Sequence, residues 1–299
     1  MSGPREPPVP GGVAHVVSIA GTDPSGGAGI QADLKTFSAL GAYGMAVVTA
    51  LVAQTTTGVT AVEGVTPGFV TAQIDTLLGD VRVDAVKIGM LADAGVVTAV
   101  AAALRRWQPP HVVVDPVMVA TSGDRLLDPD AVDALRNDLL PLADLITPNV
   151  AEAAVLAGGD PVKSLAAAEV QARDLANRLA TRVLLKGGHL GGPTSVDVLV
   201  EDSAVRTFSA PRVETANTHG TGCTLSSAIA ALRPRSATWA EAVDGAKAYL
   251  TAALAASELL QVGHGHGPVH HFWAWWPPES ASAAYPGPSK HAVASPPPR

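Results

Sequence analysis

The 299-residue sequence predicts an α/β fold in which a mostly parallel central sheet carries helices on both faces. Short apolar runs of strand length alternate with segments of helical period from about residue 13 to residue 260. The strand-like runs are apolar at almost every position, which is typical of strands buried on both faces. The most unusual chemistry follows these runs directly, where the carboxyl ends of parallel strands place ligands.

The first half of the chain alternates strands with helices. Strands are expected at residues 14–20, 45–53, 84–88 and 111–115, and helices at residues 28–40, 69–78 and 94–107. In the first helix, Ile30, Leu34 and Phe37 recur at helical spacing, and Gly41 follows as a stop signal.

The second half continues the alternation and adds a hairpin. Helices are expected near residues 131–139, from residue 150, at 165–180, near 221–232 and near 239–260, and strands at 144–146 and 182–186. Residues 195–200 and 205–208 are expected to form the hairpin, with a turn around Glu201, Asp202 and Ser203.

Composition excludes several classes of protein. The formal net charge is -7 and no run of Lys or Arg occurs, which disfavours a nucleic-acid binder. No stretch has the apolar length of a membrane span, and the N-terminus lacks the apolar core of a secretory signal. Cys223 is the single cysteine, so an internal disulfide is impossible and a cytoplasmic location is expected.

The first chemical motif is the glycine-rich loop Gly21-Thr-Asp-Pro-Ser-Gly-Gly-Ala-Gly29. Such a loop before a helix can bind a phosphate through main-chain N–H groups. A dinucleotide site would need an acidic residue at the end of the next strand, where the chain has Gln54, and no Gly-Lys-Ser/Thr sequence of a P-loop is present. The structural alternative is a tight turn in which Asp23 caps the helix.

The second motif, Thr218-His-Gly-Thr-Gly-Cys-Thr224, opens an expected helix. The main-chain amides of Gly220, Thr221, Gly222 and Cys223 would converge there and form an anion hole for a phosphoryl group in transfer. The positive end of the helix is expected to lower the pKa of the Cys223 thiol, so that a thiolate could take a proton from a substrate hydroxyl. The alternative is a buried structural cysteine.

The third group combines charged residues at three strand ends. Asp115 and Lys186 end apolar runs, and Pro148-Asn-Val-Ala-Glu152 opens a helix. The Glu152 and Asp115 carboxylates could hold Mg²⁺ through water, and Lys186 could neutralise phosphate charge. The structural alternative is a helix cap by Asn149 and Glu152 with a solvated lysine.

A histidine-rich segment, His264-Gly-His-Gly-Pro-Val-His-His271, lies near the C-terminus. A metal site is conceivable, but the glycines provide no rigid scaffold and no Cys or carboxylate lies among these histidines, which disfavours one. Trp273, Trp275 and Trp276 are expected to fold back on the domain or to mark a partner contact.

Taken together, these residues resemble the hydroxymethylpyrimidine/phosphomethylpyrimidine kinases of thiamine biosynthesis, a branch of the ribokinase-like superfamily. The run Ser18-Ile-Ala-Gly-Thr-Asp-Pro-Ser-Gly-Gly-Ala-Gly-Ile-Gln-Ala-Asp-Leu-Lys35 is the most specific part of the resemblance. Six shorter motifs extend it: Thr49–Thr55, Val86–Met90, Val114–Met118, Thr147–Glu152, Leu185–His189 and His219–Cys223. The likeness runs from about residue 13 to residue 272. We therefore expect a flexible leader at 1–12, one kinase domain at 13–272 and a disordered Pro/Ser/Ala-rich tail at 273–299.

The resemblance implies a ribokinase-like homodimer that uses ATP and Mg²⁺ in two successive phosphoryl transfers, from the pyrimidine alcohol to the monophosphate and then to the diphosphate. It places the pyrimidine at Gly21, Gln54, Met90 and Val117, and we add Asp23 to this group. It also makes Cys223 the base, with Lys186 both catalytic and nucleotide-binding beside Asp115 and Glu152. One departure is Thr121, where the family often has Lys, so the detail of the nucleotide contact is in doubt.

Two other functions stay open on the sequence alone. A pyridoxal or pyridoxine kinase shares the cysteine and the anion hole, and a pyrimidine-sensing protein without activity would keep only the binding residues. The intact Lys186, Glu152 and Gly-Thr-Gly-Cys sequence argue against the second alternative.

Overall fold

The computed structural model describes residues 12–118, 129–188 and 190–276, and these are built around an eight-stranded sheet in the order β10-β9-β8-β7-β6-β5-β1-β2. The strands are β1 (His15–Ala20), β2 (Tyr43–Val48), β5 (Ala85–Ile88), β6 (Val112–Val114), β7 (Leu145–Ile146), β8 (Arg182–Leu185), β9 (Thr194–Glu201) and β10 (Ala204–Pro211). Neighbours from β2 to β8 are parallel, whereas β9 pairs antiparallel with both β8 and β10. The mostly parallel sheet predicted from the sequence is confirmed.

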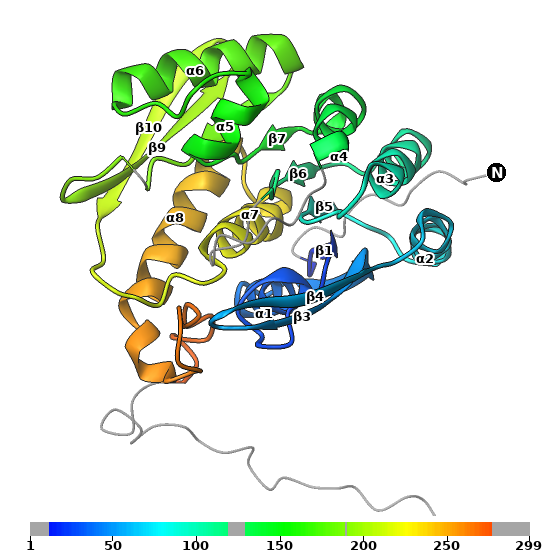
Figure 1. The fold of residues 1–299 in the computed structure, drawn as a ribbon, viewed down its shortest axis with the longest axis horizontal. Helices are drawn as coiled ribbons and strands as arrows, with labels where there is room; N and C mark the ends of the chain where they lie inside the picture. Colours follow the sequence, from blue (N-terminus) through cyan, green and yellow to red (C-terminus); the bar gives the residue numbers. More distant parts are fainter. Residues whose placement is uncertain (1–11, 119–128, 189, 277–299) are drawn as a thin grey trace, which may run out of the picture.

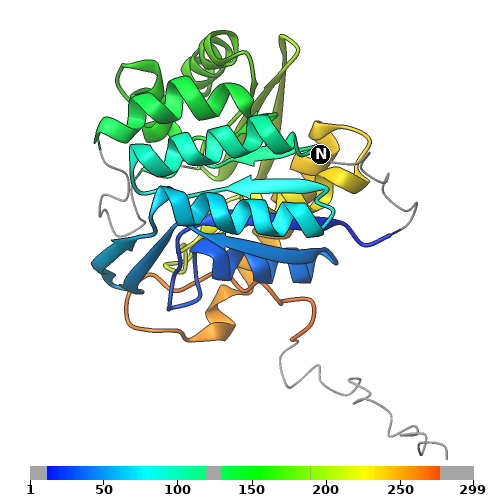
Figure 2. The ribbon, with the colours of Figure 1, turned by 90° about the vertical axis from the view of Figure 1, so that its right-hand side faces the viewer.

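Helices cover both faces of the sheet (Figures 1 and 2). One face carries α1 (Gly29–Ala39), α7 (Thr221–Leu232) and α8 (Trp239–Ala255), and the other carries α2 (Pro67–Asp80), α3 (Ala94–Trp107), α4 (Pro129–Ala134), α5 (Val150–Ala157) and α6 (Leu165–Leu179). Short turns of 3-10 or π type follow at Leu135–Leu139, Leu140–Leu142, Arg233–Arg235 and Ser257–Leu260.

Side chains of each strand alternate between the two faces, so the core has two halves. Val17, Val86 and Val114 belong to the half beneath α2 to α6, whereas Val16, Ala85 and Val113 belong to the half beneath α1, α7 and α8. This double burial explains why these strands read as continuous apolar runs in the sequence.

The single strand expected at residues 45–53 is wrong, because the chain leaves the main sheet after β2. Buried Thr49 donates its N–H to the Ala20 carbonyl and its hydroxyl to the Met90 carbonyl, which redirects the chain. The chain then forms a separate antiparallel hairpin of β3 (Ala50–Thr55) and β4 (Gly58–Gly64), which stands apart from the main sheet in Figure 1. The sequence analysis missed β4, since most of its residues are exposed and lack an apolar pattern.

Local sequence signals fix several element ends as expected. Asn149 and Glu152 form a capping box at the start of α5, and Thr238 and Glu241 form another at the start of α8. The predicted hairpin is formed by β9 and β10, and Asp202 and Ser203 in its turn have left-handed φ angles of 48° and 66°.

The chain beyond α8 lies against the domain, and residues 263–271 are called the C-terminal strap below. Trp273, Trp275 and Trp276 donate main-chain N–H groups to the carbonyls of His270 and Phe272, so these three tryptophans lie in a hydrogen-bonded turn. Their side chains are exposed, and Trp276 contacts the rings of His270 and Phe272. The expected domain limits of 12/13 and 272/273 stay predictions. No helix in the described ranges is long and apolar enough to cross a membrane.

Candidate active site

The predicted site residues gather where parallel strands end. Gly21 follows β1, Met90 follows β5, Asp115 follows β6, and Lys186 follows β8. Because β1, β5, β6, β7 and β8 are parallel neighbours, their carboxyl ends lie at one edge of the sheet. The N-terminus of α7 belongs to the same edge, since an added Cβ at Gly222 would lie 3.3 Å from both Asp115 Oδ2 and Lys186 Nζ.

The charged centre of the site is formed by Asp115, Lys186 and Glu152. Lys186 Nζ lies 2.7 Å from Asp115 Oδ1 and 3.9 Å from Glu152 Oε2. Thr147 donates its hydroxyl to Asp115 Oδ1 at 2.9 Å, which fixes the carboxylate from the end of β7. Two acidic side chains therefore share one lysine. The sequence analysis expected these three residues at one edge of the sheet, and their roles toward Mg²⁺ and phosphate stay predictions.

Glu152 has a second role as a helix cap. Its carboxylate accepts the Asn149 N–H at 2.8 Å and a main-chain N–H of Met118, so both readings of this motif are compatible. Burial, reinforced by the Asp115 carboxylate and opposed by Lys186, raises the pKa of Glu152 to about 7. A charge change at this carboxyl group near neutral pH is the consequence.

The N-terminus of α7 presents main-chain amides that have no acceptor among the residues the structure describes. Gly220 is its N-cap residue, with a left-handed φ of 76° and no side-chain cap hydrogen bond. The Thr221 N–H donates to the Thr218 carbonyl at 3.3 Å, whereas Gly222 and Cys223 lie in the first turn, where a helix has no internal acceptor for the amides. The structure thus leaves the Gly222 and Cys223 amides available to an anion, beside the Lys186 ammonium.

The two glycine-rich motifs interlock at this point. The Asp23 carboxylate is 2.7 Å from His219 Nε2, and the Gly27 carbonyl leaves no room for a Cβ at Gly220. Asp23 also accepts the main-chain N–H groups of Ser25, Gly27 and Ala28. These amides are therefore used inside the loop, which disfavours both a phosphate site and a dinucleotide site at residues 21–29.

The Asp23 carboxylate therefore has an internal role in the structure. Its pKa is lowered to about 2, because hydrogen bonds from His219 and Ser25 and the His219 charge outweigh the opposing effect of burial. It holds the turn before α1 as the capping alternative expected, and it joins that turn to the α7 motif.

Cys223 lies between the N-termini of two helices, but its pKa moves opposite to the expectation. The Gly29 N–H, at the start of α1, donates to the Cys223 sulfur. Burial among protein atoms nevertheless raises the pKa of the thiol to about 11, and Asp33 and Asp115 add to the rise while Lys87 opposes it. The expected lowering by the helix end is therefore wrong, since desolvation is the larger effect.

Three of the residues expected around the pyrimidine, Gly21, Gln54 and Met90, lie in or beside a small apolar cluster. Gly21 lies against Met90 and Ala50, so that an added Cβ would be 3.1 Å from Met90 Sδ. Ala50, Val52 and Met90 form the cluster, and Gln54 follows on the same strand after a bulge. Val117 lies two residues beyond Asp115, whereas Thr121 falls outside the described residues.

Three supporting groups were missed by the sequence analysis. Lys87 and Asp33 form an ion pair with no exposed side-chain surface, which cannot be read from two distant single residues. The C-terminal strap donates main-chain N–H groups of His264, Gly265 and His266 to Thr56 at the tip of the β3–β4 hairpin, and Pro268 pairs with His219.

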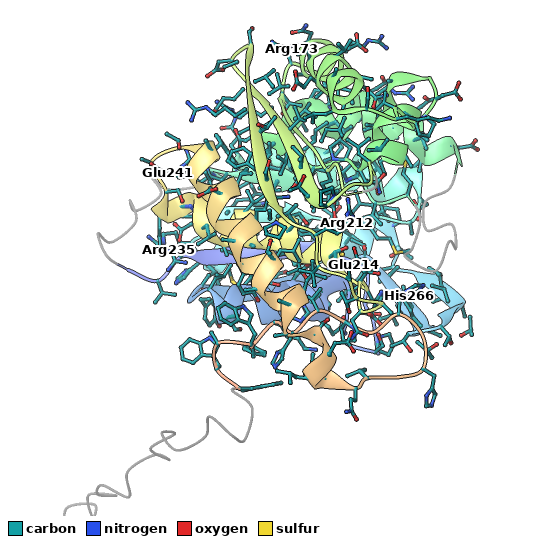
Figure 3. The ribbon with its side chains drawn as sticks, turned by 90° about the vertical axis from the view of Figure 1, so that its left-hand side faces the viewer. Arg173, Arg212, Glu214, Arg235, Glu241 and His266 are labelled. Atoms are coloured by element: carbon teal, nitrogen blue, oxygen red, sulfur yellow. The ribbon has the colours of Figure 1, made fainter. Side chains whose placement is uncertain are left out.

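The third supporting group is an arginine behind the loop after β8. Arg212, labelled in Figure 3, donates to the carbonyls of Gly188, Gly191 and Gly192. This loop begins directly after Lys186, so Arg212 restrains the chain that carries the lysine.

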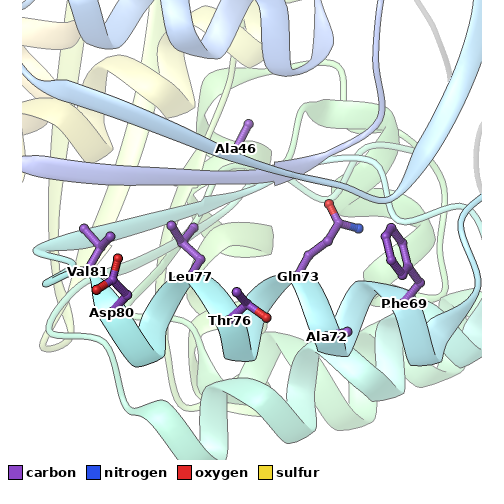
Figure 4. A pocket seen from close by; sticks show the side chains of 8 residues that line it. All are labelled: Ala46, Phe69, Ala72, Gln73, Thr76, Leu77, Asp80 and Val81. Atoms are coloured by element: carbon purple, nitrogen blue, oxygen red, sulfur yellow. The ribbon is translucent and has the colours of Figure 1, made fainter.

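A separate shallow hollow of about 460 Å³ runs along α2 beside β2 (Figure 4). Ala46, Phe69, Gln73 and Leu77 are among its lining residues, and none of the predicted site residues lines it. Its walls carry one charged side chain, Asp80, and it is separate from the site described above.

Known proteins resemble the chain over most of its length. The phosphomethylpyrimidine kinase family matches residues 23–270. The hydroxymethylpyrimidine/phosphomethylpyrimidine kinase of Escherichia coli K12 is 56% identical over 262 residues, which cover 88% of this chain and 98% of that protein.

Solved structures agree with the sequence comparison. A phosphomethylpyrimidine kinase from Clostridium difficile 630 has 40% identity and a TM-score of 0.71, covering 80% of this chain and 98% of its own. The pyridoxal kinase of Bacillus subtilis, solved as an ADP complex, has 35% identity and a TM-score of 0.80, covering 87% of this chain and 98% of its own. The fold is thus the ribokinase-like α/β fold that the sequence predicted, and the chain belongs to the phosphomethylpyrimidine kinase family.

Proposed function

We propose that this chain transfers phosphoryl groups from ATP to 4-amino-5-hydroxymethyl-2-methylpyrimidine, first to the monophosphate and then to the diphosphate, in thiamine biosynthesis. The proposal is supported by the names of two relatives, a hydroxymethylpyrimidine/phosphomethylpyrimidine kinase and a phosphomethylpyrimidine kinase. The observation that carries the proposal is the position of Gly222, where an added Cβ would be 3.3 Å from both Asp115 Oδ2 and Lys186 Nζ. This position supports an anion hole in which the amides at the start of α7 act together with Lys186.

The residues divide the work between charge and position. The Gly222 and Cys223 amides and the Lys186 ammonium stabilise the negative charge of the migrating phosphoryl group. Gly21, Gln54, Met90 and Val117 hold the pyrimidine ring so that its hydroxymethyl oxygen faces the anion hole. Binding energy in such reactions goes mainly into alignment and electrostatics.

Cys223 takes the proton of the substrate hydroxyl in this proposal. A thiol with a pKa of about 11 is protonated at neutral pH, so the thiolate must be stabilised when substrate and nucleotide are bound. The second transfer has a phosphate as attacking group, which needs no strong base.

ATP and Mg²⁺ fit the donor groups of the site. Asp115 and Glu152 offer carboxylate oxygens, the ligand type that Mg²⁺ prefers, and they would hold it through water. Bound Mg²⁺ would supply positive charge to the triphosphate.

A homodimer in the cytoplasm completes the proposal. Leu51 on β3 is 55% exposed on the hairpin face opposite buried Val52, and the same hairpin of a second copy would bury it. Light scattering on the wild-type protein and on Leu51→Asp tests this contact, with a shift from dimer to monomer expected in the variant. The single cysteine suits a reducing compartment.

The test is a coupled assay of ADP formation with the hydroxymethylpyrimidine, its monophosphate and pyridoxal as separate substrates. We expect the highest kcat/KM for the two pyrimidines, and Cys223→Ala should lose most turnover while it still binds pyrimidine. A higher kcat/KM for pyridoxal would instead support the pyridoxal kinase alternative, which the TM-score of 0.80 to the Bacillus enzyme favours. Pyrimidine binding without any ADP formation would leave only a sensing function.

A further inference from the structure

Lys87 and Asp33 form a fully buried ion pair to which the proposed function gives no task. Lys87 Nζ lies 2.9 Å from Asp33 Oδ1 and 2.8 Å from Oδ2, and both side chains are 0% exposed. Ser18 Oγ donates to Asp33 Oδ2 at 2.5 Å and Ser227 Oγ donates to Oδ1 at 2.6 Å. A buried pair costs several kcal/mol of desolvation per ion, and apolar residues often replace it without loss of stability. A role beyond stability is therefore worth seeking.

The pair lies directly below Cys223, as the packing of α1 against α7 shows. Gly29 on α1 donates its N–H to the Cys223 sulfur on α7. Four residues further along each helix, Asp33 accepts the hydroxyl of Ser227. Residues four apart lie on the same helix face about one turn, or roughly 5.4 Å, apart. The two contacts between α1 and α7 are thus one helical turn apart. The Asp33 carboxylate lies one turn further from the helix N-termini than the Cys223 thiol.

Lys87 reaches this position from the central sheet. It lies on β5, and an added Cβ at Gly89 would be 2.9 Å from its Nζ, so the ammonium lies near the end of the strand that leads to Met90. The Lys87 ammonium therefore lies between the end of β5, at the edge of the site, and the buried Asp33 carboxylate near Cys223.

The charges around the thiol come from four elements. Asp33 of α1 and Asp115 after β6 oppose a thiolate, whereas Lys87 of β5 and Lys186 after β8 favour it. Burial also opposes the thiolate, and Lys87 provides the largest effect in the other direction. Although burial alone would lower the pKa of Lys87, Asp33, Cys223 and Asp115 together hold it raised, so the ammonium keeps its charge.

We propose that Lys87 is a positioning residue of the reaction, whose buried ammonium, anchored by Asp33, stabilises the Cys223 thiolate. This inference rests on the proposed function. In the step that it supports, the thiolate takes the proton of the substrate hydroxyl, and the freed oxygen forms a bond to the γ-phosphorus. The bond from phosphorus to the bridging oxygen breaks, and that oxygen leaves with its electron pair on ADP.

The test measures the thiolate itself, which is possible because Cys223 is the single cysteine of the chain. The rate of alkylation of the full-length protein by iodoacetamide is followed from about pH 7 to about pH 11, since the thiolate is the reacting form. Lys87→Met should lower the rate at about pH 9 by roughly tenfold, the change that corresponds to one pKa unit. Asp33→Asn should raise it by roughly threefold or more, because a negative charge near the sulfur is lost while Asp115 and the thiolate itself still favour a charged Lys87.

Arg82→Met is the matched control. Arg82 precedes the same strand at its other end and pairs with Asp84, so the variant removes one positive charge remote from the thiol. It should leave the alkylation profile unchanged. If Lys87→Met fails to fold, Asp33→Asn and the neutral double variant Lys87→Met/Asp33→Asn decide the question, and the double variant should react more slowly than Asp33→Asn alone.

Opposite shifts in the two single variants support the proposal, because general loosening of the site would speed alkylation in both. Equal profiles, or shifts of the same sign, overturn it. The measurement needs no phosphoryl transfer. A thiolate that responds as expected in a protein without pyrimidine kinase activity would thus refute the proposed function and leave the electrostatic role of Lys87 in place.

Discussion

Replacing Gly220 by alanine tests the interlocked glycine motifs in one step. Gly220 has a φ of 76°, in the left-handed region that L side chains rarely adopt. A Cβ there would collide with the Gly27 carbonyl, which belongs to the rigid turn held by Asp23. The α7 N-terminus would have to move away from that turn, and the Gly222 and Cys223 amides would move with it.

The matched control is Gly158→Ala at the end of α5. Gly158 has a similar φ of 73°, but nothing lies within 4 Å of its added Cβ. In both variants an alanine in the left-handed conformation destabilises the fold by about 1–2 kcal/mol. Only Gly220→Ala adds a steric clash, which destabilises it by about 1–3 kcal/mol more. Thermal unfolding should therefore show a drop in Tm of roughly 2–6 °C for Gly158→Ala and a clearly larger drop for Gly220→Ala.

Turnover separates the variants further. A displacement of about 1 Å in a reacting group can cost roughly 100-fold in rate, so kcat of Gly220→Ala should fall by about that factor while Gly158→Ala keeps its kcat. If the two variants show the same Tm and the same kcat, the close packing of residues 27 and 220 has no role in shaping the anion hole.

Three further predictions concern buried charges. The pKa of Glu152 is raised from 4.5 to about 7, so its contribution to stability is full below pH 4.5 and is lost as the pH rises through 7. Glu152→Gln should remove this loss and stabilise the fold by up to about 3 kcal/mol at pH 8. Denaturant unfolding of the wild type and the variant checks this, and a stability difference that is the same at pH 5 and pH 8 would contradict it. The pKa of Asp23 is lowered from 3.8 to about 2, so its contribution to stability is present above pH 3.8 and is lost as the pH falls through 2. Asp23→Asn should therefore weaken the loss of unfolding free energy between pH 4 and pH 2, and an unchanged loss would refute this. Lys247→Met leaves the buried Asp197 without its ion-pair partner and should lower the free energy of unfolding by about 3–5 kcal/mol. Arg178→Ala removes an exposed ion pair and should lower it by less than about 1 kcal/mol. Equal denaturation midpoints for the two variants would contradict this prediction.

Much of the fold was predictable because burial on both sheet faces leaves a continuous apolar record in the strands. The capping box of Asn149 and Glu152 was equally visible, since both partners lie within one helical turn. The break after Val48 was not predictable, because residues 45–53 contain no Gly or Pro and the redirecting bonds of Thr49 reach Ala20 and Met90. Only the folded chain brings those partners together.

The site was predictable in its residues and less so in its electrostatics. Motif spacing placed Asp115, Lys186 and Cys223 at strand and helix ends, where the structure has them. The direction of the thiol pKa was wrong, since it depends on how much protein surrounds the sulfur, a tertiary property. The contact of Asp23 with His219, 196 residues away, likewise has no local signal in the sequence.

The C-terminal strap has a consequence for how the enzyme comes into being. The α7 motif takes its final place beside Pro268, and the tip of the β3–β4 hairpin is tied to His264, Gly265 and His266. A nascent chain still attached to the ribosome therefore lacks two braces of its active centre until almost the last residue of the domain has emerged.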